Sequence, residues 1–270
     1  MIALTIAGSD SCGGAGIQAD IKTFSAFGVY GASVITALTA QNTCGVIGIV
    51  PTPPGFIAKQ IDAVASDLAI GAVKTGMLAT RDAVLAVSER VRHYNLHPLV
   101  VDPVMVATGG EVLLDGDAIG AVRHHLIPLA DLVTPNLHEA ARLLDLPVAR
   151  TVDEMKAQAS FLRSRFGARN VLIKGGHGEG PEAVDALLAG DEFIALALPR
   201  LDTGNTHGTG CTLSAAIAAL LALAVPLPDA VERAKRYVWH GIQAGKALNV
   251  GKGAGPIDHL YSLRKHPLPE

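Results

Sequence analysis

The stretch Asp202–Ile217, DTGNTHGTGCTLSAAI, carries the strongest structural signal in the chain. Glycines and small polar residues come first, and a run of apolar and small residues begins at Leu213. This order predicts a tight loop that leads into a buried helix. The first amides of a helix have no partner within it, so they suit a phosphate or a developing negative charge. The residues predicted to present these amides are Gly208, Thr209, Gly210 and Cys211.

The thiol of Cys211 falls in the first turn of this predicted helix. A helix N-terminus favours the thiolate, so the sequence predicts a lowered pKa for Cys211. An ordinary glycine-rich loop with a buried cysteine at the start of a core helix has the same local pattern. The rest of the chain must therefore decide between a reactive site and a structural one.

The composition indicates a compact globular protein and excludes disorder. Of the 270 residues, 49% are hydrophobic and 17% charged, and a net charge of −3 without basic clusters argues against a nucleic-acid surface. The cysteines Cys12, Cys44 and Cys211 stand far apart, which is typical of a reducing compartment. The N-terminus lacks a basic leader, and the most apolar segment, 213–225, is too short to span a bilayer. We therefore expect a cytoplasmic protein with neither a membrane nor a nucleic acid as partner.

Runs of strand length alternate with helical patterns along most of the chain. The predicted strands cover 1–7, 30–40, 45–50, 72–77, 99–104, 131–134 and 171–174. The predicted helices cover 17–27, 56–68, 82–94, 118–126, 137–144 and 152–166, and two more follow Gly208 and Leu227. A hairpin over 183–198, turned at Gly190-Asp191, interrupts the alternation. Short connections between strands and helices predict a parallel sheet covered on both faces, and the absence of a linker predicts one domain, 1–270.

In open α/β sheets, ligands bind at the carboxyl ends of the strands. This rule brings several polar or glycine-rich loops to one edge of the predicted sheet. They are 8–16, Met77, 102–110, 136–139, 174–176 and 204–211. Two familiar phosphate motifs are absent there, because Gly14-Ala-Gly16 lacks the third glycine of a dinucleotide fingerprint and no segment has Walker A spacing.

Asn136 and Glu139 open a predicted helix after a strand and allow two interpretations. A carboxylate at this position can hold Mg²⁺ through water, because Mg²⁺ prefers oxygen ligands and keeps its hydration. Alternatively, Asn136 only caps the helix while Glu139 favours its positive end.

Several motifs, in this order along the chain, resemble those of one known family. They are GSDSCGGAGIQADIKTFSAFGVYG, ALTAQNT, KTGM, VVDPVM, TPNLHEA, LIKGGH and THGTGCTLSAAI. Together they resemble the ribokinase-like superfamily and, within it, the hydroxymethylpyrimidine/phosphomethylpyrimidine kinases of thiamine biosynthesis. The resemblance covers nearly the whole chain.

The resemblance implies an α/β fold, a ribokinase-like three-layer sandwich with a mostly parallel central sheet and helices on both faces. It also implies a homodimer that uses ATP and Mg²⁺. The implied substrate is 4-amino-5-hydroxymethyl-2-methylpyrimidine, which is phosphorylated once and then again to the pyrophosphate. The family often has a Lys-Ser pair where this chain has Thr108-Gly109, so no role is carried over to Thr108.

For the pyrimidine, the resemblance points to Gln41, whose carboxamide offers a donor beside an acceptor and so matches a ring nitrogen and an exocyclic amine. Without the resemblance, a glutamine at the end of a strand that faces water is the alternative. Asp20 is a candidate for orienting the polar groups of the substrate, although a solvent-facing helix residue would look the same. Met77 is a candidate for packing on the ring or simply in the core. Gly8 and Val104 complete the predicted substrate site.

For ATP, the resemblance places Lys174 near the phosphates, with Asn136 and Thr206 also in the nucleotide site. A lysine that only extends out of the sheet edge is the alternative for Lys174. Glu139 and Asp102 are the predicted magnesium–water ligands, although an aspartate that only caps the turn would look the same at position 102.

The resemblance also implies the identity of the catalytic base. Related sugar kinases carry an aspartate as base where this chain has Cys211, so Cys211 is the predicted base.

Two other functions remain open from the sequence. A pyridoxal or pyridoxine kinase of the same superfamily acts on a hydroxymethyl group of an aromatic nitrogen ring. A catalytically silent pyrimidine sensor on the same fold would bind the ligand without consuming ATP.

Overall fold

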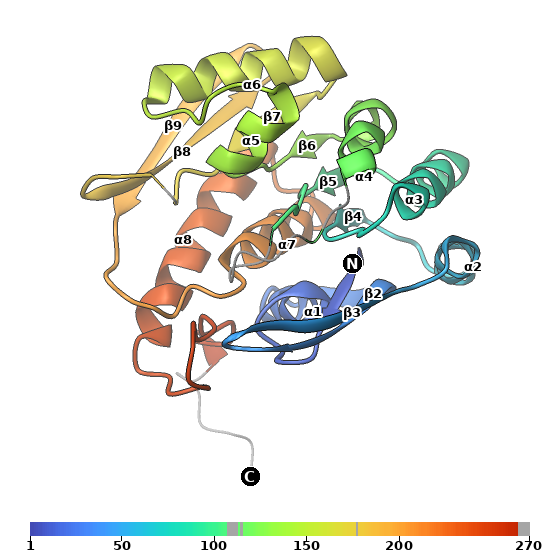
Figure 1. The fold of residues 1–270 in the computed structure, drawn as a ribbon, viewed down its shortest axis with the longest axis horizontal. Coiled ribbons are helices and arrows are strands. Elements are labelled where there is room, and N and C mark those ends of the chain that lie inside the picture. The colour runs from blue at the N-terminus through green and yellow to red at the C-terminus, as the bar shows by residue number, and fades with distance from the viewer. Residues whose placement is uncertain (107–112, 114–115, 177, 264–270) are drawn as a thin grey trace.

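The computed structural model of the chain describes residues 1–106, 113, 116–176 and 178–263. The Thr108-Gly109 departure noted in the sequence lies outside these residues. Figure 1 shows the arrangement of helices around a central sheet.

The strands of the described residues form one nine-stranded sheet in the order β3-β2-β1-β4-β5-β6-β7-β8-β9. Their bounds are β1 Ile2–Asp10, β2 Tyr30–Asn42, β3 Gly45–Pro51, β4 Ala72–Thr75, β5 Leu99–Val101, β6 Leu132–Val133, β7 Asn170–Ile173, β8 Glu182–Ala189 and β9 Glu192–Pro199. The pairs from β2 through β1 to β7 are parallel, whereas β3, β8 and β9 pair antiparallel with their neighbours. The predicted parallel sheet is confirmed, and so is the hairpin turned at Gly190-Asp191.

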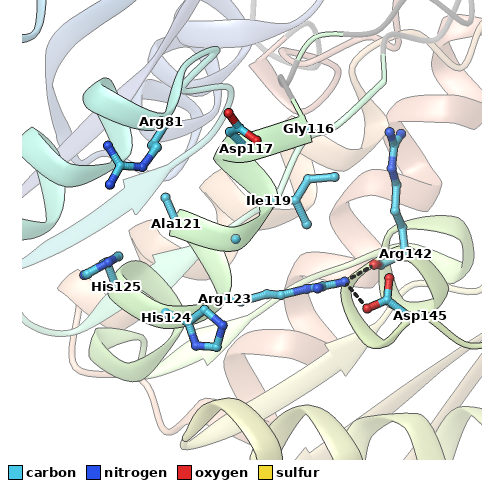
Figure 2. Close-up of a pocket in the computed structure, with 11 residues that line it drawn as sticks. Arg81, Gly116, Asp117, Ile119, Ala121, Arg123, His124, His125, Arg142 and Asp145 are labelled. Carbon is cyan, nitrogen blue, oxygen red and sulfur yellow. Dashed lines mark hydrogen bonds and ion pairs between the residues drawn. The ribbon is translucent and has the colours of Figure 1, made fainter.

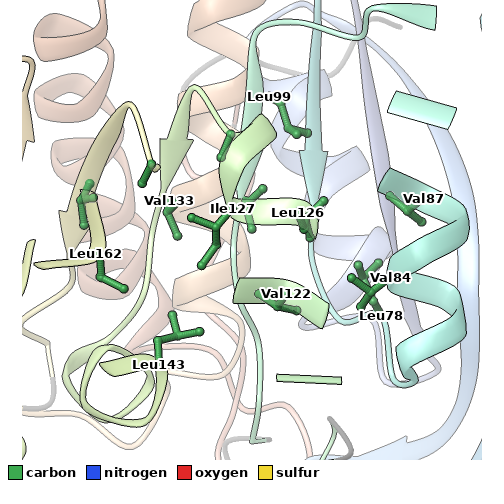
Figure 3. Packing of buried hydrophobic residues seen from close by; sticks show 14 of the residues in the cluster. Leu78, Val84, Val87, Leu99, Val122, Leu126, Ile127, Val133, Leu143 and Leu162 are labelled. Atoms are coloured by element: carbon green, nitrogen blue, oxygen red, sulfur yellow. The ribbon is translucent and has the colours of Figure 1, made fainter. Parts of the chain in front are cut away.

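Helices cover both faces of this sheet. Their bounds are α1 Gly16–Ala26, α2 Pro54–Ala65, α3 Arg81–Tyr94, α4 Gly116–Ala121, α5 Leu137–Leu144, α6 Val152–Phe166, α7 Thr209–Ala222 and α8 Leu227–Gly245. Alternate strand residues point to opposite faces. Leu4 and Ile6 therefore join a core with α2 to α6, while Ala3 joins a second core with α1, α7 and α8. Figure 3 shows the first core, where side chains from the sheet meet those of several helices. The three-layer sandwich is confirmed.

Several predicted boundaries differ from the structure for local reasons. The strand predicted over 99–104 ends at Val101, because the Asp102 amide makes a last bond to the Thr75 carbonyl and Pro103 has no amide hydrogen to continue the ladder. The helix predicted over 118–126 is α4 followed by a π-helical turn, Val122–Leu126, and a 3-10 turn. Apolar periodicity does not distinguish these turns from an α-helix.

The apolar helix after Gly208 is α7, and nearly all its residues are buried between the sheet and its neighbouring helices. None of the helices in the described part of the chain combines the length and apolar character that crossing a bilayer requires. The prediction that this segment is a core helix is confirmed.

The core under α5 provides a test of packing. Leu143 is fully buried (0% exposed), whereas Leu223 is 39% exposed. Leu143→Ala should lower the free energy of unfolding by about 2–5 kcal/mol, because it leaves a cavity in the core. Leu223→Ala should change it by less than ~0.5 kcal/mol. Urea denaturation of both variants measures the difference, and equal destabilisation would contradict the packing described here.

Candidate active site

A cavity of about 710 Å³ opens where the carboxyl ends of the parallel strands face the N-terminus of α7. This volume lies in the range of small-ligand sites. Nearly every residue predicted for the site lines the cavity. They are Gly8, Gln41, Met77, Asp102, Val104, Asn136, Glu139, Lys174, Thr206, Gly208, Thr209, Gly210 and Cys211. The prediction that these loops share one edge of the sheet is therefore confirmed, while the role of each residue stays a prediction.

The first turn of α7 forms the middle of the cavity. Gly208 is the N-cap and has a left-handed backbone with φ 82°. A Cβ on Gly208 would lie 1.8 Å from the carbonyl oxygen of Gly14, so only glycine fits between the two loops. The cap has no side-chain hydrogen bond, and the cavity is lined by Thr209, Gly210 and Cys211 of the first turn. This is the arrangement in which helix amides bind an anion.

The thiol of Cys211 is where it was predicted, but its predicted pKa is wrong for the protein without ligand. Burial raises the pKa of Cys211 to about 11, and the charge of Lys74 and a hydrogen bond from the Gly16 amide oppose that effect only in part. Desolvation of the thiolate therefore outweighs the helix N-terminus. In this state Cys211 is a neutral thiol at pH 7.

A charged cluster lies beside this turn at the ends of β5, β7 and the start of α5. The Lys174 Nζ is 2.7 Å from Asp102 Oδ1 and 3.9 Å from Glu139 Oε2. Burial raises the pKa of Glu139 to about 7, although the Lys174 charge opposes the shift. The two carboxylates outweigh burial at Lys174, so its pKa is raised. The Ser214 hydroxyl donates to the other Asp102 oxygen at 3.0 Å.

Asn136 and Glu139 form a reciprocal capping box at the start of α5. The Asn136 side chain accepts from the Glu139 amide at 2.9 Å, and Glu139 Oε2 accepts from the Asn136 amide at 2.7 Å. The capping interpretation is therefore confirmed. Both residues also line the cavity, so capping and ligand contact are compatible here.

The carboxylates of this cluster suit a hydrated magnesium ion better than a closed metal cage. Within the described residues, no group of three or more His, Cys, Asp or Glu side chains is arranged to hold a metal. Asp102 and Glu139 offer only oxygen ligands, and Mg²⁺ keeps several waters at such sites. The residues present therefore fit Mg²⁺ bound largely through water and phosphate.

Asp20, predicted to orient the substrate, does not line the cavity with the other predicted site residues. Its carboxylate is fully buried and lies 2.6 and 2.7 Å from the Nζ of Lys74, and Thr5 donates to it at 2.6 Å. Asp20 lies on the inner face of α1, within reach of Lys74 on β4. The sequence does not reveal this contact. Lys74 itself lines the cavity and was missed. Its signal was a lysine in the middle of a strand that is otherwise buried.

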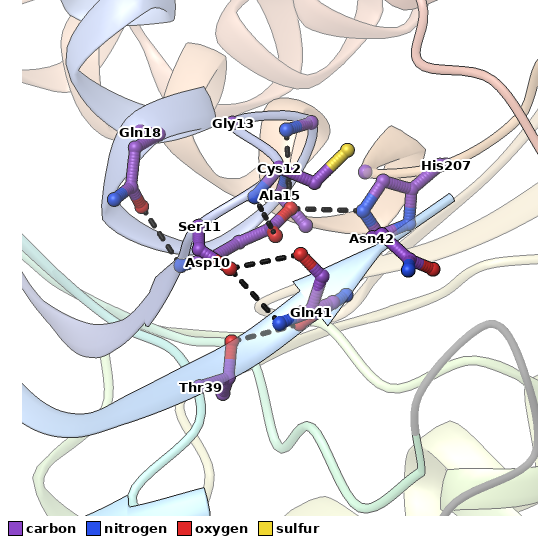
Figure 4. Close-up of polar contacts among 12 residues, drawn as sticks. Asp10, Ser11, Cys12, Gly13, Ala15, Gln18, Thr39, Gln41, Asn42 and His207 are labelled. Carbon is purple, nitrogen blue, oxygen red and sulfur yellow. Dashed lines mark hydrogen bonds and ion pairs between the residues drawn. The ribbon is translucent and has the colours of Figure 1, made fainter. Parts of the chain in front are cut away.

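The end of the cavity that contains Gln41 is formed by β1, β2 and β4. Gln41 is half-buried, and the Thr39 hydroxyl donates to its side-chain oxygen at 3.1 Å (Figure 4). Ser11 exchanges hydrogen bonds with the Gln41 backbone at 2.8 and 2.9 Å. A Cβ on Gly8 would lie 3.1 Å from the sulfur of Met77, so glycine there leaves room for the Met77 side chain.

The opposite end of the cavity is largely apolar and was not predicted. Its walls are Leu198, Leu201, Leu213, Val238 and Ile242. A buried ion pair adjoins them, with Lys235 Nζ 2.7 Å from Asp185 Oδ2. The apolar residues have the same sequence pattern as core residues, so the sequence held no signal for this wall.

A second hollow of about 560 Å³ lies over α4 and the following turn (Figure 2). It is lined by cationic residues, but Arg123 bonds Asp145 at 2.9 Å and the carbonyl of Arg142 at 2.7 Å. The terminal guanidinium nitrogen of Arg123 is thus used within the protein. The larger cavity, with its glycine loop and buried charges, is the candidate active site.

Comparison with known proteins agrees with this geometry. The family profile described as phosphomethylpyrimidine kinase matches residues 10–258. The chain is 52% identical to the hydroxymethylpyrimidine/phosphomethylpyrimidine kinase of Rhizobium meliloti over 96% of this chain and 97% of that protein.

Two solved structures are similar as well. The phosphomethylpyrimidine kinase of Clostridium difficile 630 is 44% identical with a TM-score of 0.79, covering 90% of this chain and 99% of that one. The Bacillus subtilis pyridoxal kinase in an ADP complex is 36% identical with a TM-score of 0.89, covering 98% of both chains. The chain belongs to the phosphomethylpyrimidine kinase family.

Proposed function

We propose that this protein is an ATP-dependent kinase of thiamine biosynthesis that acts on 4-amino-5-hydroxymethyl-2-methylpyrimidine and then on its monophosphate. One observation carries the proposal. The first turn of α7, with Cys211, lies in one cavity between the Gln41 end and the Lys174 cluster. An acceptor alcohol at one end and a phosphate donor at the other would then meet at the helix amides.

In this proposal the apolar end of the cavity takes the nucleoside, and the phosphates extend toward Lys174. Asn136 and Thr206 line the same region. Phosphoryl transfer depends mainly on positioning and charge stabilisation. Asp102 and Glu139 would hold Mg²⁺ through water, and the ion, when bound, neutralises charge on the transferring phosphates.

At the acceptor end, Gln41 reads the ring nitrogen and exocyclic amine, and Met77 with Val104 and Gly8 contacts the ring. Cys211 removes the proton of the hydroxymethyl group as its oxygen bonds to the γ-phosphorus and the bond to ADP breaks. The amides of Gly208, Thr209 and Gly210 hold the phosphoryl group during this step. The pKa of about 11 belongs to the ligand-free protein, and a ligand that fills the cavity changes the surroundings of the thiol.

We also propose that the chain acts as one kinase domain, in the cytoplasm and as a homodimer. One continuous sheet supports the single domain. Exposed apolar side chains on β2, β3 and α2, among them Ile47 and Phe56, support a contact between copies. Light scattering during size-exclusion chromatography measures the mass in solution, and a monomer of 27.9 kDa would contradict the dimer.

The function is tested by ATP consumption with three acceptors: the aminopyrimidine alcohol, its monophosphate and pyridoxal. We expect turnover with the first two. Pyridoxal is included because the similar Bacillus subtilis structure is a pyridoxal kinase. Faster turnover with pyridoxal would favour that activity instead, and tight binding of the pyrimidine without ATP consumption would indicate a silent sensor.

Gln41→Leu should weaken pyrimidine binding selectively. The variant keeps the approximate size but leaves polar groups of the ligand unpaired, which costs about 1–3 kcal/mol, or roughly tenfold to a hundredfold in affinity. The exposed Gln243 on α8 provides the matched control, Gln243→Leu, which should bind normally. Isothermal titration with the pyrimidine and with ATP gives both affinities. Equal weakening of both ligands, or of neither, would remove Gln41 from the substrate site.

Cys211→Ala should slow the alcohol step far more than the monophosphate step. General-base help is worth about 10²–10⁴-fold for a neutral alcohol. The monophosphate is already largely dianionic at neutral pH, because its second pKa is ~6, so it needs no base. Single-turnover rates with each substrate give the ratio, and Cys44→Ala, at an exposed free cysteine, is the control.

The pH dependence provides an independent check on the same residue. With the pKa of Cys211 raised to about 11, the thiolate fraction grows with each step of pH between 7 and 9. The kcat/KM for the alcohol, which reports the pKa values of the free enzyme, should therefore rise over this range in the wild-type protein and lose that slope in Cys211→Ala. A slowing of both steps by one factor would instead make Cys211 a packing residue.

A further inference from the structure

The chain holds a buried His–Asp pair that the proposed mechanism does not use. His207 Nε2 lies 2.9 Å from Asp10 Oδ2, and the two residues are separated by 197 positions in the sequence. Their side chains are only 6% and 3% exposed. Figure 4 shows the imidazole pointing at the carboxylate from the loop that precedes α7.

Asp10 organises the loop between β1 and α1. One carboxylate oxygen accepts from the Cys12 amide at 2.8 Å, and the other accepts from the amides of Gly14 and Ala15 at 3.1 and 2.8 Å. These bonds and His207 hold the pKa of Asp10 below its usual value, although burial opposes the shift. An ionised carboxylate only accepts hydrogen bonds, so the Nε2 of His207 carries the proton and donates it.

The same pair fixes the contact between the two glycine loops. A Cβ on Gly14 would lie 2.4 Å from Cδ2 of His207, and a Cβ on Gly208 would lie 1.8 Å from the Gly14 carbonyl. The loops therefore approach as closely as glycine allows. His207 is followed directly by Gly208, the N-cap of α7, so its hydrogen bond to Asp10 anchors the chain one residue before that helix.

Asp10 also lies close to β2, the strand that carries Gln41. Ser11, the next residue, exchanges hydrogen bonds with the backbone of Gln41. A continuous series of contacts thus runs from Gln41 through Ser11, Asp10 and His207 to Gly208. Beside the close contact of Gly14 and Gly208, the hydrogen bond between Asp10 and His207 thus lies on the route from the acceptor end of the cavity to the anion-binding turn.

We propose that Asp10 and His207 are a positioning pair that sets the separation between the pyrimidine-binding loop and the first turn of α7. The inference rests on the proposed kinase function. The pair acts through Gln41 and the helix amides, and it matters for turnover more than for ATP binding, since Lys174, Asn136 and most of the apolar wall proposed for the nucleoside lie on other elements.

The central variants are His207→Leu and His207→Gln. Leucine removes the donor, whereas the glutamine side-chain amide places a donor close to the position of Nε2. We expect His207→Leu to lower kcat for both phosphorylation steps about 10- to 100-fold, because a misplacement on the order of 1 Å costs roughly 10²-fold. The KM for ATP should change less than ~threefold, and His207→Gln should recover most of kcat.

Another His–Asp pair in the protein provides the matched control. His97 Nδ1 lies 2.6 Å from Asp131 Oδ2 near the start of β5, away from the cavity. His97→Gln should leave kcat unchanged even if thermal stability falls. Should His207→Leu fail to fold, Gly14→Ala displaces the imidazole without removing either partner and should give the same loss of kcat at nearly constant KM for ATP.

The positioning role would be contradicted if His207→Leu left kcat unchanged, or if His207→Leu and His207→Gln lowered kcat equally. It would also be contradicted if His97→Gln lowered kcat as much as His207→Leu. A readout without substrate separates this inference from the proposed function. The rate at which iodoacetamide alkylates Cys211, followed by peptide mass spectrometry, should shift in His207→Leu and return in His207→Gln. That result would support the pair even if the wild-type protein failed to phosphorylate the pyrimidine, and an unchanged alkylation rate would count against it.

Discussion

The close approach of Gly208 to the Gly14 carbonyl is the constraint on which the site depends. With 1.8 Å between that oxygen and the position of any added Cβ, no other residue fits at the N-cap of α7. The contact brings the beginnings of α1 and α7 together at the same edge of the sheet. Because both are helix N-termini, the cavity between them carries a positive potential from backbone amides alone. The side chains around it then tune a site that the backbone has already formed.

Buried ion pairs are the second feature of this cavity. Lys74 with Asp20, Lys174 with Asp102, and Lys235 with Asp185 each place a lysine on its wall. Burying such charges costs free energy that their attraction recovers only when geometry is good, so these pairs are weak evidence for stability. We interpret the three lysines as preorganised for an anion, because charged groups that are already desolvated need no rearrangement when a phosphate binds.

The same burial explains the state of Cys211. A helix N-terminus favours a thiolate, yet desolvation within the cavity raises the pKa of the Cys211 thiol to about 11. The neutral thiol of the free protein is thus consistent with a group whose reactivity depends on what occupies the cavity. Burial has the same effect on Glu139, because it disfavours the carboxylate and raises the pKa of that residue to about 7.

The sequence by itself determined the layers of the fold and the edge that carries the site. Alternating strands and helices require a parallel sheet covered on both faces, and loops after parallel strands meet at one edge, so Lys174, Asn136 and Cys211 were found in one cavity as expected. Only the tertiary structure decided what depends on distances between segments remote in the chain. It paired Asp20 with Lys74 in the interior, joined Asp10 to His207, and made a cavity wall from ordinary apolar residues. Hydrophobic periodicity predicts which face of a helix or strand is buried. The contact partner of a buried side chain, and how far that side chain is removed from water, depend on three-dimensional packing and could not be predicted from periodicity.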